Sequence, residues 1–266
     1  MIPRAAITQW RAEHAPWPLD EQVEQDLIIS RALVDLFNDP LIAATMAFRG
    51  GTALNKLYFE PAARYSEDID LVQIVPGDIG PALTAIRDRL AWLGIARYAH
   101  KDKLVTLTFK FTTEFEPVST RKLKVEINTR EHFSVQPLIH HAFAVESLAW
   151  KYSGSTSIPT YSFEELLGTK LRALYERRKG RDVFDLAYAM QQSTPPDLDA
   201  VIECFLEYVR RDGHAISRAK LESNFDDKCK YPGFLQEVNA FLAPGVSFDP
   251  VADPVRVRDL LARLPK

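Results

Sequence analysis

The side chains with the clearest chemical potential are two aspartates, Asp68 and Asp70, separated by one residue. They open an apolar run that predicts a strand over residues 68–75. Because alternate residues of a strand point to the same face, both carboxylates should lie on one side of the sheet. Paired carboxylates of this kind are good ligands for Mg²⁺ or Mn²⁺. The alternative is a strand end that carries two solvated acids.

A pair of glycines, Gly50 and Gly51, lies upstream of these acids. A glycine pair allows a tight backbone turn whose N–H groups point at an anion, and the helix predicted at 52–59 adds its positive end there. The hydroxyl of Thr52 can join them in holding phosphates. A phosphate cradle beside a carboxylate metal site is typical of nucleotidyl transfer. The simpler alternatives are a plain turn for the glycines and a helix cap for Thr52.

A second polar segment begins on a predicted helix that spans 162–178 and continues beyond it; the helix begins with a Ser-x-x-Glu capping box. Lys170 and Arg177 share one face of this helix at helical spacing. The run then reaches Asp182 and Asp185. Most such basic runs are solvated helix faces, which is the alternative here. The other basic residues of the segment are Arg172, Arg178, Lys179 and Arg181.

The order of these motifs resembles the polymerase-beta-like nucleotidyltransferase superfamily, in which Gly-Gly precedes Asp-x-Asp. Within it, segments 50–54 and 66–71 resemble the AbiEii family, the toxin halves of bacterial abortive-infection toxin–antitoxin systems. Segment 170–186 is similar to the last motif of that family: Lys-Leu-x-Ala-Leu, a basic run, and Arg-Asp-x-x-Asp-Leu. The resemblance covers about residues 20–190.

The resemblance implies an α+β fold, with a polymerase-beta-like domain of mixed sheet and helices before a C-terminal helical domain. It also implies that Ser66 and Lys170 contact the triphosphate of a bound NTP, although Ser66 read alone is a turn residue. In some members the corresponding serine is phosphorylated by an antitoxin kinase. Asp182 is implied as a further catalytic residue, and Arg181 is assigned to nucleotide binding. Asp185 is expected to cap the helix or pair with an arginine.

A third carboxylate is needed for a two-metal site. Glu126 lies in the middle of a strand predicted over 123–128, whose polar residues share one face. In the superfamily a third acid on a neighbouring strand activates the attacking hydroxyl, and Glu126 is the best-placed candidate for this catalytic and metal-binding role. The alternative is an amphipathic strand whose polar face lies in water.

The bulk composition is that of an ordinary globular protein, with 266 residues, 46% hydrophobic and 26% charged. The net charge of −3 excludes a chain that binds nucleic acid by its overall charge, so any RNA contact needs a local basic patch. Cys204 and Cys229 have no metal-ligand spacing and are predicted to be free, buried thiols. With no membrane-length apolar run and no signal-peptide pattern, the chain is expected to be cytoplasmic.

Periodicity predicts an irregular N-terminal arm, two domains and a change of character near the loop at 154–159, which is rich in Ser, Thr and Gly. The domains are predicted as 1–158, the catalytic domain with an N-terminal helical arm, and 159–266, the helical domain that carries Lys170 and Asp182. The remaining predicted strands are 43–49 and 105–111, and the remaining predicted helices are 19–37, 79–93, 182–191, 198–211 and 216–225.

The resemblance further implies a toxin that transfers a nucleoside monophosphate from an NTP, with the 3′ end of tRNA as its acceptor. It implies a neighbouring antitoxin that has a winged-helix DNA-binding domain. Two other functions stay open: a small-molecule nucleotidyltransferase of the aminoglycoside type, and a non-catalytic binding module of the same fold.

Overall fold

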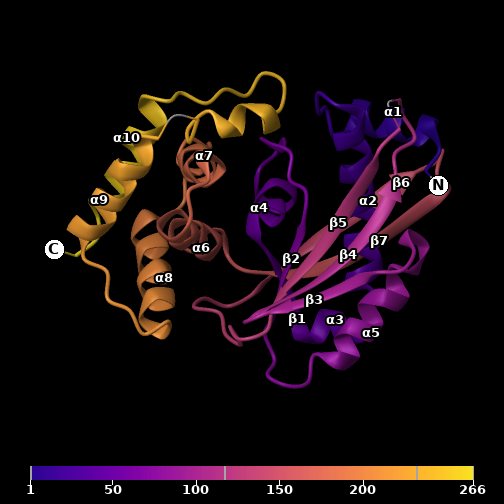
Figure 1. Ribbon diagram of the computed structural model, residues 1–266, viewed down its shortest axis with the longest axis horizontal. Coiled ribbons are helices and arrows are strands. Elements are labelled where there is room, and N and C mark those ends of the chain that lie inside the picture. Colours follow the sequence, from indigo (N-terminus) through magenta and orange to yellow (C-terminus); the bar gives the residue numbers. More distant parts are fainter. Residues whose placement is uncertain (1, 117, 232, 266) are drawn as a thin grey trace. The chain divides into compact units, whose positions relative to one another are not determined.

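The computed structural model of the protein describes residues 2–116, 118–231 and 233–265 (Figure 1). The chain forms two compact units. The first comprises Met1–Ser134 with Leu138–Thr160, and the second comprises Val135–Pro137 with Tyr161–Lys266. Residues 135–137 lie in sequence between segments of the first unit, but their contacts assign them to the helical unit.

The first unit is built on a seven-stranded sheet in the order β3-β4-β5-β2-β1-β7-β6. Pairs β1–β7 and β2–β5 are parallel and the other pairs are antiparallel, so the sheet is mixed, as predicted. The strands are β1 Met46–Arg49, β2 Ile69–Gln73, β3 Arg97–Lys101, β4 Leu104–Thr112, β5 Thr120–Asn128, β6 Ile139–Ser147 and β7 Tyr152–Thr160.

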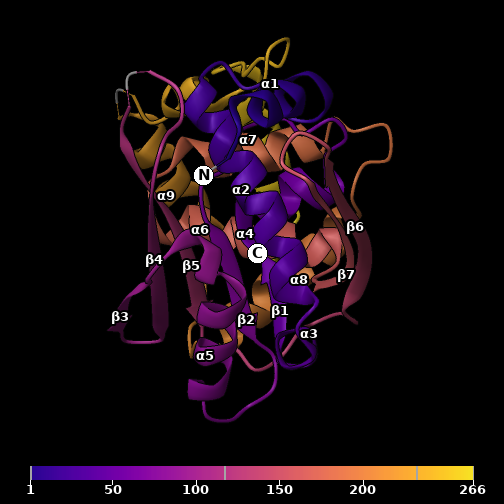
Figure 2. The same cartoon turned by 90° about the vertical axis from the view of Figure 1, so that its right-hand side faces the viewer.

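Helix α2 is the main helical support of this sheet, because it packs against β6 and β7 (Figure 2). The apolar residues that predict it are all buried, from Val23 to Phe37. A helix that is buried over most of its surface gains most of its stability from this packing. The helices of the unit are α1 Arg4–Glu13, α2 Asp20–Phe37, α3 Pro40–Thr45, α4 Gly50–Ala53 with the π-helical η1 Leu54–Tyr58, α5 Gly80–Arg89 and the 3₁₀ turn η2 Ala91–Leu93.

Three expectations about this unit are wrong, and two of its strands were not predicted. The N-terminal arm is not irregular, because it contains α1. The strand predicted at 43–49 begins at Met46, since Asp39 caps α3 by accepting from the N–H groups of the second and third helical residues. The loop predicted at 154–159 is part of β7, whose weak strand formers are held by pairing with β6 and β1. Strands β3 and β6 were not predicted.

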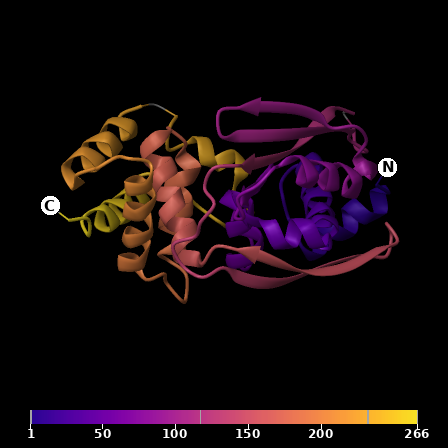
Figure 3. The same cartoon turned by 90° about the horizontal axis from the view of Figure 1, so that it is seen from below.

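The second unit consists of helices (Figure 3). Helices α6 and α8 approach closely at Gly168, where a Cβ would lie 2.8 Å from the Cβ of Cys204. A larger residue at this position would therefore push the two helices apart. The elements are α6 Phe163–Glu176, α7 Gly180–Ala189, α8 Leu198–Arg211, α9 Arg218–Cys229, the 3₁₀ turn η3 Glu237–Phe241 and α10 Ala252–Leu261.

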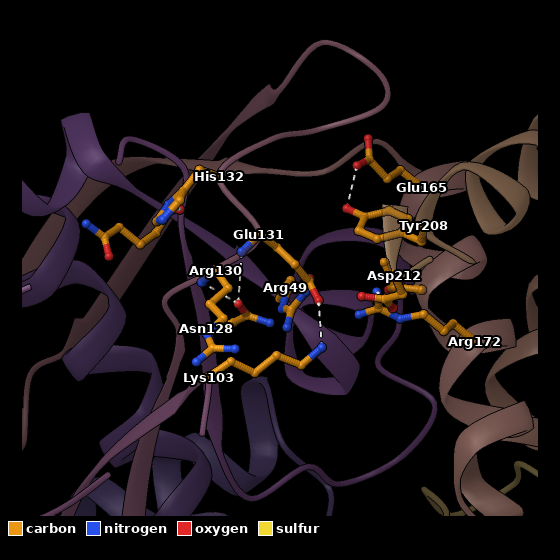
Figure 4. Close-up of polar contacts among 12 residues, drawn as sticks. Arg49, Lys103, Asn128, Arg130, Glu131, His132, Glu165, Arg172, Tyr208 and Asp212 are labelled. Atoms are coloured by element: carbon orange, nitrogen blue, oxygen red, sulfur yellow. Dashed lines mark hydrogen bonds and ion pairs between the residues drawn. The ribbon is translucent and has the colours of Figure 1, made fainter. Parts of the chain in front are cut away.

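Glu165 explains why residues 135–137 join the helical unit. Ser162 caps α6 as predicted, by accepting from Glu165 N at 3.1 Å. The Glu165 carboxylate accepts from Val135 N and Gln136 N at 2.8 and 2.9 Å, and from the hydroxyl of Tyr208 at 2.8 Å (Figure 4). Burial raises the pKa of Glu165 despite these bonds. The carboxylate thus ties residues 135 and 136 to α6 and α8.

Cys204 and Cys229 are both free thiols, as predicted; Cys204 is buried, whereas Cys229 is half-buried. In the part of the chain that the structure describes, no helix combines the length and the apolar character that a membrane crossing requires.

Candidate active site

Three carboxylates occupy one face of the sheet in the first unit. Asp70 on β2 and Glu126 on β5 are register partners in a parallel pair, so their side chains emerge side by side. Asp68 precedes β2 by one residue and lies close enough to both for their charges to act on it. The structure therefore brings together the three acids that the sequence singles out, and we call Asp68, Asp70 and Glu126 the carboxylate face.

One ammonium group lies within this face. Lys124 Nζ is 3.9 Å from Asp68 Oδ2 and 4.0 Å from Glu126 Oε1. The pKa of Asp68 is raised to about 7, chiefly by burial; the Lys124 ammonium opposes this rise, and the charges of Asp70 and Glu126 add to it. The face thus holds more negative charge than its lysine neutralises, which is a favourable environment for a divalent cation.

Gly50 and Asp70 fit each other in shape. Gly50 has a φ of +82°, a conformation that residues with a side chain rarely adopt. A Cβ built on Gly50 would lie 2.1 Å from Asp70 Oδ2 and 2.8 Å from Asp70 Cγ. The missing side chain therefore makes room for the Asp70 carboxylate against the glycine turn. Gly51, the next residue, is buried in the first turn of α4.

Thr52 and Ser66 meet next to the acids. The Thr52 hydroxyl oxygen is 2.8 Å from Ser66 Oγ and 2.5 Å from the carbonyl oxygen of Asp68. Thr52 is 1% exposed, so its hydroxyl is used in fixing the segment that carries Asp68. From α2, Gln25 Nε2 donates to the carbonyl oxygens of Glu67 and Lys122 at 2.8 and 3.2 Å. The sequence did not predict this role of Gln25.

A second polar group that the sequence did not predict surrounds Glu131, just after β5 (Figure 4). Arg49 Nη1 lies 2.6 Å from one carboxylate oxygen of Glu131, and Lys103 Nζ lies 3.8 Å from the other. The Asn128 side chain accepts from the N–H groups of Arg130 and Glu131 at 2.9 and 3.1 Å. Arg49 directly precedes Gly50, so this buried pairing anchors the entrance to the glycine turn.

The basic motif of the second unit forms a network of ion pairs around two buried aspartates. Lys170 Nζ lies 3.2 Å from Asp182 Oδ1 and 2.8 Å from Asp185 Oδ2. Arg177 donates to both oxygens of Asp182, at 2.8 and 2.9 Å. The side chains of Asp182 and Asp185 are 0% exposed and that of Lys170 is 7% exposed. Although burial alone would raise it, Lys170 and Arg177 hold the pKa of Asp182 at about 2.

Three other basic residues near this network contact aromatic or acidic side chains of the second unit. The guanidinium of Arg181 is 6.0 Å from the ring centroid of Phe241, and that of Arg178 is 3.5 Å from that of Tyr231. Lys179 Nζ lies 3.5 Å from a carboxylate oxygen of Glu237. The nucleotide-binding role of Arg181 stays a prediction.

The carboxylate face suits a hard divalent cation, because it offers carboxylate oxygens on two adjacent strands. Among the described residues, no group of three or more His, Cys, Asp or Glu side chains is placed so that it could hold a metal ion. Asp68 and Glu126 instead approach the Lys124 ammonium, which takes the place of a cation between them. The carboxylate oxygens are of the type that the predicted metal prefers, and the metal-binding role of these residues stays a prediction.

A mixed sheet with three carboxylates beside a glycine turn is the arrangement that the sequence predicts for a nucleotidyltransferase. The sequence matches the family model described as "Nucleotidyl transferase AbiEii toxin, Type IV TA system" over residues 31–261, so the chain belongs to this family. It is a nucleotidyltransferase toxin of a type IV toxin–antitoxin system, which confirms the family resemblance. A search of curated proteins gave no match.

Two solved structures share the fold. MenT4, a nucleotidyltransferase toxin from Mycobacterium tuberculosis H37Rv, superposes with a TM-score of 0.70 at 19% identity, covering 100% of this chain and 91% of that one. JHP933 from Helicobacter pylori superposes with a TM-score of 0.55 at 16% identity, covering 92% of this chain and 91% of that one. These likenesses confirm the predicted fold class.

Proposed function

We propose that the carboxylate face binds a divalent cation, Mg²⁺ or Mn²⁺, and transfers a nucleoside monophosphate from an NTP to an acceptor hydroxyl. The observation that carries this proposal is the register of Asp70 with Glu126, which sets two acids side by side near Asp68. The alternative is that the acids are simply solvated at the end of a strand. In that case Asp70 would not need a glycine at position 50 to make room for its carboxylate.

In this mechanism Asp68 and Asp70 hold the cation, which supplies positive charge to the transferring phosphate when it is bound. The N–H groups of the turn at Gly50 and Gly51 bind phosphate oxygens. Glu126 accepts the proton of the acceptor hydroxyl. The hydroxyl oxygen forms a bond with the α-phosphorus, the bond from that phosphorus to the bridging oxygen breaks, and pyrophosphate leaves.

Thr52 and Ser66 support this site in different ways. We assign Thr52 a positioning role, because its buried hydroxyl is already bonded beside Ser66 and to the backbone of Asp68. Ser66 is half-buried and keeps the predicted contact with the triphosphate as a proposal. Phosphorylation of Ser66 would put negative charge where the triphosphate is proposed to bind, and would therefore inhibit transfer.

For the second unit, the family supports a role of Lys170 at the triphosphate and of Asp182 and Arg181 in the site. Lys170 is shared by two buried carboxylates, so it can contact a phosphate only by giving up part of that pairing. Calorimetry with a non-hydrolysable NTP tests this role in Lys170→Ala. Weaker binding by a protein that unfolds like wild type supports phosphate contact, whereas equal affinity with lower stability assigns Lys170 to the network alone.

We further propose that the acceptor is the 3′ end of tRNA, that the toxin acts in the cytoplasm, and that its antitoxin contains a winged-helix domain. These proposals rest on the family. The test is incubation of the protein with each labelled NTP, Mg²⁺ and total tRNA, with Asp70→Asn as the inactive control. Label in tRNA that depends on Asp70 is expected. Label that appears on a small hydroxyl compound such as an aminoglycoside, and not on tRNA, would contradict the acceptor.

A further inference from the structure

Strands β3, β4 and β5 lie side by side at one end of the sheet (Figure 2), and one side of them continues the carboxylate face. Glu126 on β5 is the register partner of Asp70 on β2 and, across its other edge, of Thr106 on β4. Thr106 is in turn the partner of Ala99 on the edge strand β3. Because register partners share a side of the sheet, this side runs from the candidate active site to the edge strand.

Five cations stand on this side of the three strands. The opposite side belongs to the core, where Leu107 and Phe109 of β4 are fully buried. All residues of β3, β4 and β5 are described by the structure, and Glu126 is the only acid among those that share the side of the cations. All five cations except Lys124 are exposed. We call them the basic face, and they are Arg97, Lys101, Lys110, Lys122 and Lys124.

Two members of the basic face repel each other. Lys110 and Lys122 are direct register partners across β4 and β5, a position in which like charges lower the stability of a sheet. Within the part of the chain that the structure describes, the four exposed members of the basic face form no ion pair and no side-chain hydrogen bond. The acids closest in sequence, Asp102, Glu114 and Glu116, lie in the turns between the strands. The fold gains nothing from this arrangement, whereas an anionic partner would relieve the repulsion.

The other side chains of this side indicate which kind of anion fits. Thr106, Thr108 and Thr112 of β4 alternate along it and add hydroxyl groups to the cations. Lysine, arginine and threonine are residues that contact phosphate oxygens of nucleic acids. None of the residues of β3, β4 and β5 on this side is aromatic, so it offers no ring on which a base could stack. The composition therefore fits a phosphate backbone rather than bases.

The basic face also meets the requirement that the charge of the whole chain sets for an RNA contact. With a net charge of −3, the molecule attracts nucleic acid only where its cations are concentrated. The face is such a concentration, and Lys124, at its inner end, lies 3.9 Å from Asp68 Oδ2. A polyanion that lies on the face would thus have one end beside the carboxylates.

We propose that the basic face binds the phosphate backbone of the RNA acceptor, next to the 3′ end that enters the carboxylate face. This inference rests on the proposed transfer to RNA and names the surface that holds the acceptor during the reaction. Contacts to the backbone carry no sequence information. The acceptor is therefore selected by its charge and by the reach of its end, and RNA of different sequences binds with similar affinity.

The test is the fluorescence anisotropy of a labelled tRNA transcript that is titrated with the full chain in the absence of NTP, so that binding is measured without catalysis. Wild type is expected to bind with a Kd of about 1–100 µM, the range of sequence-independent nucleic-acid binding. Lys110→Gln combined with Lys122→Gln should raise this Kd about 10-fold and lower the slope of log K against log salt concentration by about 1.5, because two phosphate contacts are lost.

Thermal unfolding of the double variant distinguishes binding from a structural role. Because the variant removes a repulsion between register partners, it should unfold at the same temperature as wild type or at a higher one. Lys151→Gln combined with Lys220→Gln is the matched control, since it removes the same charge from exposed residues of a turn and of α9. The control should bind the tRNA within about 2-fold of wild type.

The proposal is overturned if wild type does not bind the tRNA, if the folded double variant binds it like wild type, or if the control loses as much affinity. Tighter binding of poly-glutamate than of tRNA would assign the face to an acidic protein instead. Transfer to tRNA with an unchanged KM in the double variant would overturn the basic face and leave the proposed function intact. RNA binding that depends on the face, in a protein that labels no RNA, would support the face and contradict the acceptor.

Discussion

The carboxylate face of the first unit and the Lys170 network of the second unit are both built from carboxylates and cationic side chains, yet their charges are balanced to different degrees. In the network, Lys170 and Arg177 pair with Asp182 and Asp185, and both carboxylates are fully buried. In the carboxylate face, one half-exposed lysine lies among three acids. In the network, two carboxylates pair with two cations. In the face, three carboxylates lie around a single lysine.

The pKa values of Asp68 in the face and Asp182 in the network reflect this difference. Burial raises the pKa of Asp68 to about 7, with its neighbouring acids adding to the effect. Asp182 is more deeply buried, but its two cationic partners hold its pKa at about 2. A buried acid with a low pKa has partners that stabilise the fold, while an acid with a raised pKa lacks the cation that would balance it. We therefore expect substitutions in the face to affect catalysis and substitutions in the network to affect stability.

The largest expected effect is on catalysis at Asp70. Asp70→Asn should lower the rate of transfer more than about 10²-fold, the scale at which a positioned catalytic group acts. Its thermal unfolding should stay close to that of wild type, because the carboxylate is not part of the core. Glu67→Gln, in the same segment and on a half-exposed side chain, is the matched control. Wild-type activity in Asp70→Asn would remove the face from the mechanism.

Gly50→Ala should lower activity by a similar factor, about 10²-fold, without removing a charged group. The added methyl group would occupy the position of Asp70 Oδ2 and displace the carboxylate. Gly245→Ala is the control, because Gly245 has nearly the same φ, +83°, and no atom lies within 4 Å of the place that its Cβ would take. Both variants carry the same backbone strain of about 1 kcal/mol, so a difference in activity isolates the contact with Asp70.

In the network, Asp182→Asn should lower the free energy of unfolding by about 3 kcal/mol, because two cations lose a buried partner. The surface variant Asp227→Asn breaks an exposed ion pair with Lys230 and should change it by less than about 1 kcal/mol. Urea unfolding at pH 7 measures both. Equal stabilities of the two variants would contradict the assignment of the network to the fold.

The same variant gives a pH dependence whose sign is fixed. The pKa of Asp182 is lowered from 3.8 to about 2 on folding, so its contribution is complete above pH 4 and is lost as the pH falls towards 2. The difference in stability between wild type and Asp182→Asn should therefore stay constant from pH 7 to about 4 and shrink below it. A difference that grows on acidification would show that the sign is wrong.

The smallest effect is expected at Lys124. If its ammonium competes with a divalent cation, Lys124→Met should raise the apparent affinity for Mg²⁺ by up to about 5-fold, since the lysine is half-exposed and its pairings are screened. Lys122→Met, on the exposed part of the same strand, is the control. Unchanged Mg²⁺ dependence together with a higher KM for the NTP would assign Lys124 to the phosphates.

Long amphipathic helices could be predicted from the sequence because their signal is local. The helix expected at 198–211 is α8, which Asp197 caps. β7 could not be predicted, since its Gly, Ser and Thr residues favour a loop, and its pairing with β6, which was itself not predicted, and with β1 makes them a strand. The strand register that sets Asp70 beside Glu126 is also non-local, so their proximity could be argued from the family but not from spacing.

The sequence predicts the motif residues of the candidate site but not the residues that hold them in place. Asp68, Asp70 and Gly50 stand in a recognisable pattern, whereas Gln25, Arg49 and Glu131 act through partners far away in the sequence. A basic run also gives no sign of which lysine is buried. The sequence favours a phosphate contact for Lys170, and the two aspartates that enclose it become apparent only when α6 and α7 pack.

The most direct test of the central claim is a Mn²⁺ titration followed by electron paramagnetic resonance, with a non-hydrolysable NTP present. We predict that wild type binds Mn²⁺, that Glu67→Gln binds it equally well, and that Asp70→Asn loses at least about 10-fold in affinity, as expected when a carboxylate ligand is removed. Equal Mn²⁺ affinity in wild type and Asp70→Asn would contradict the assignment of the carboxylate face as the metal site.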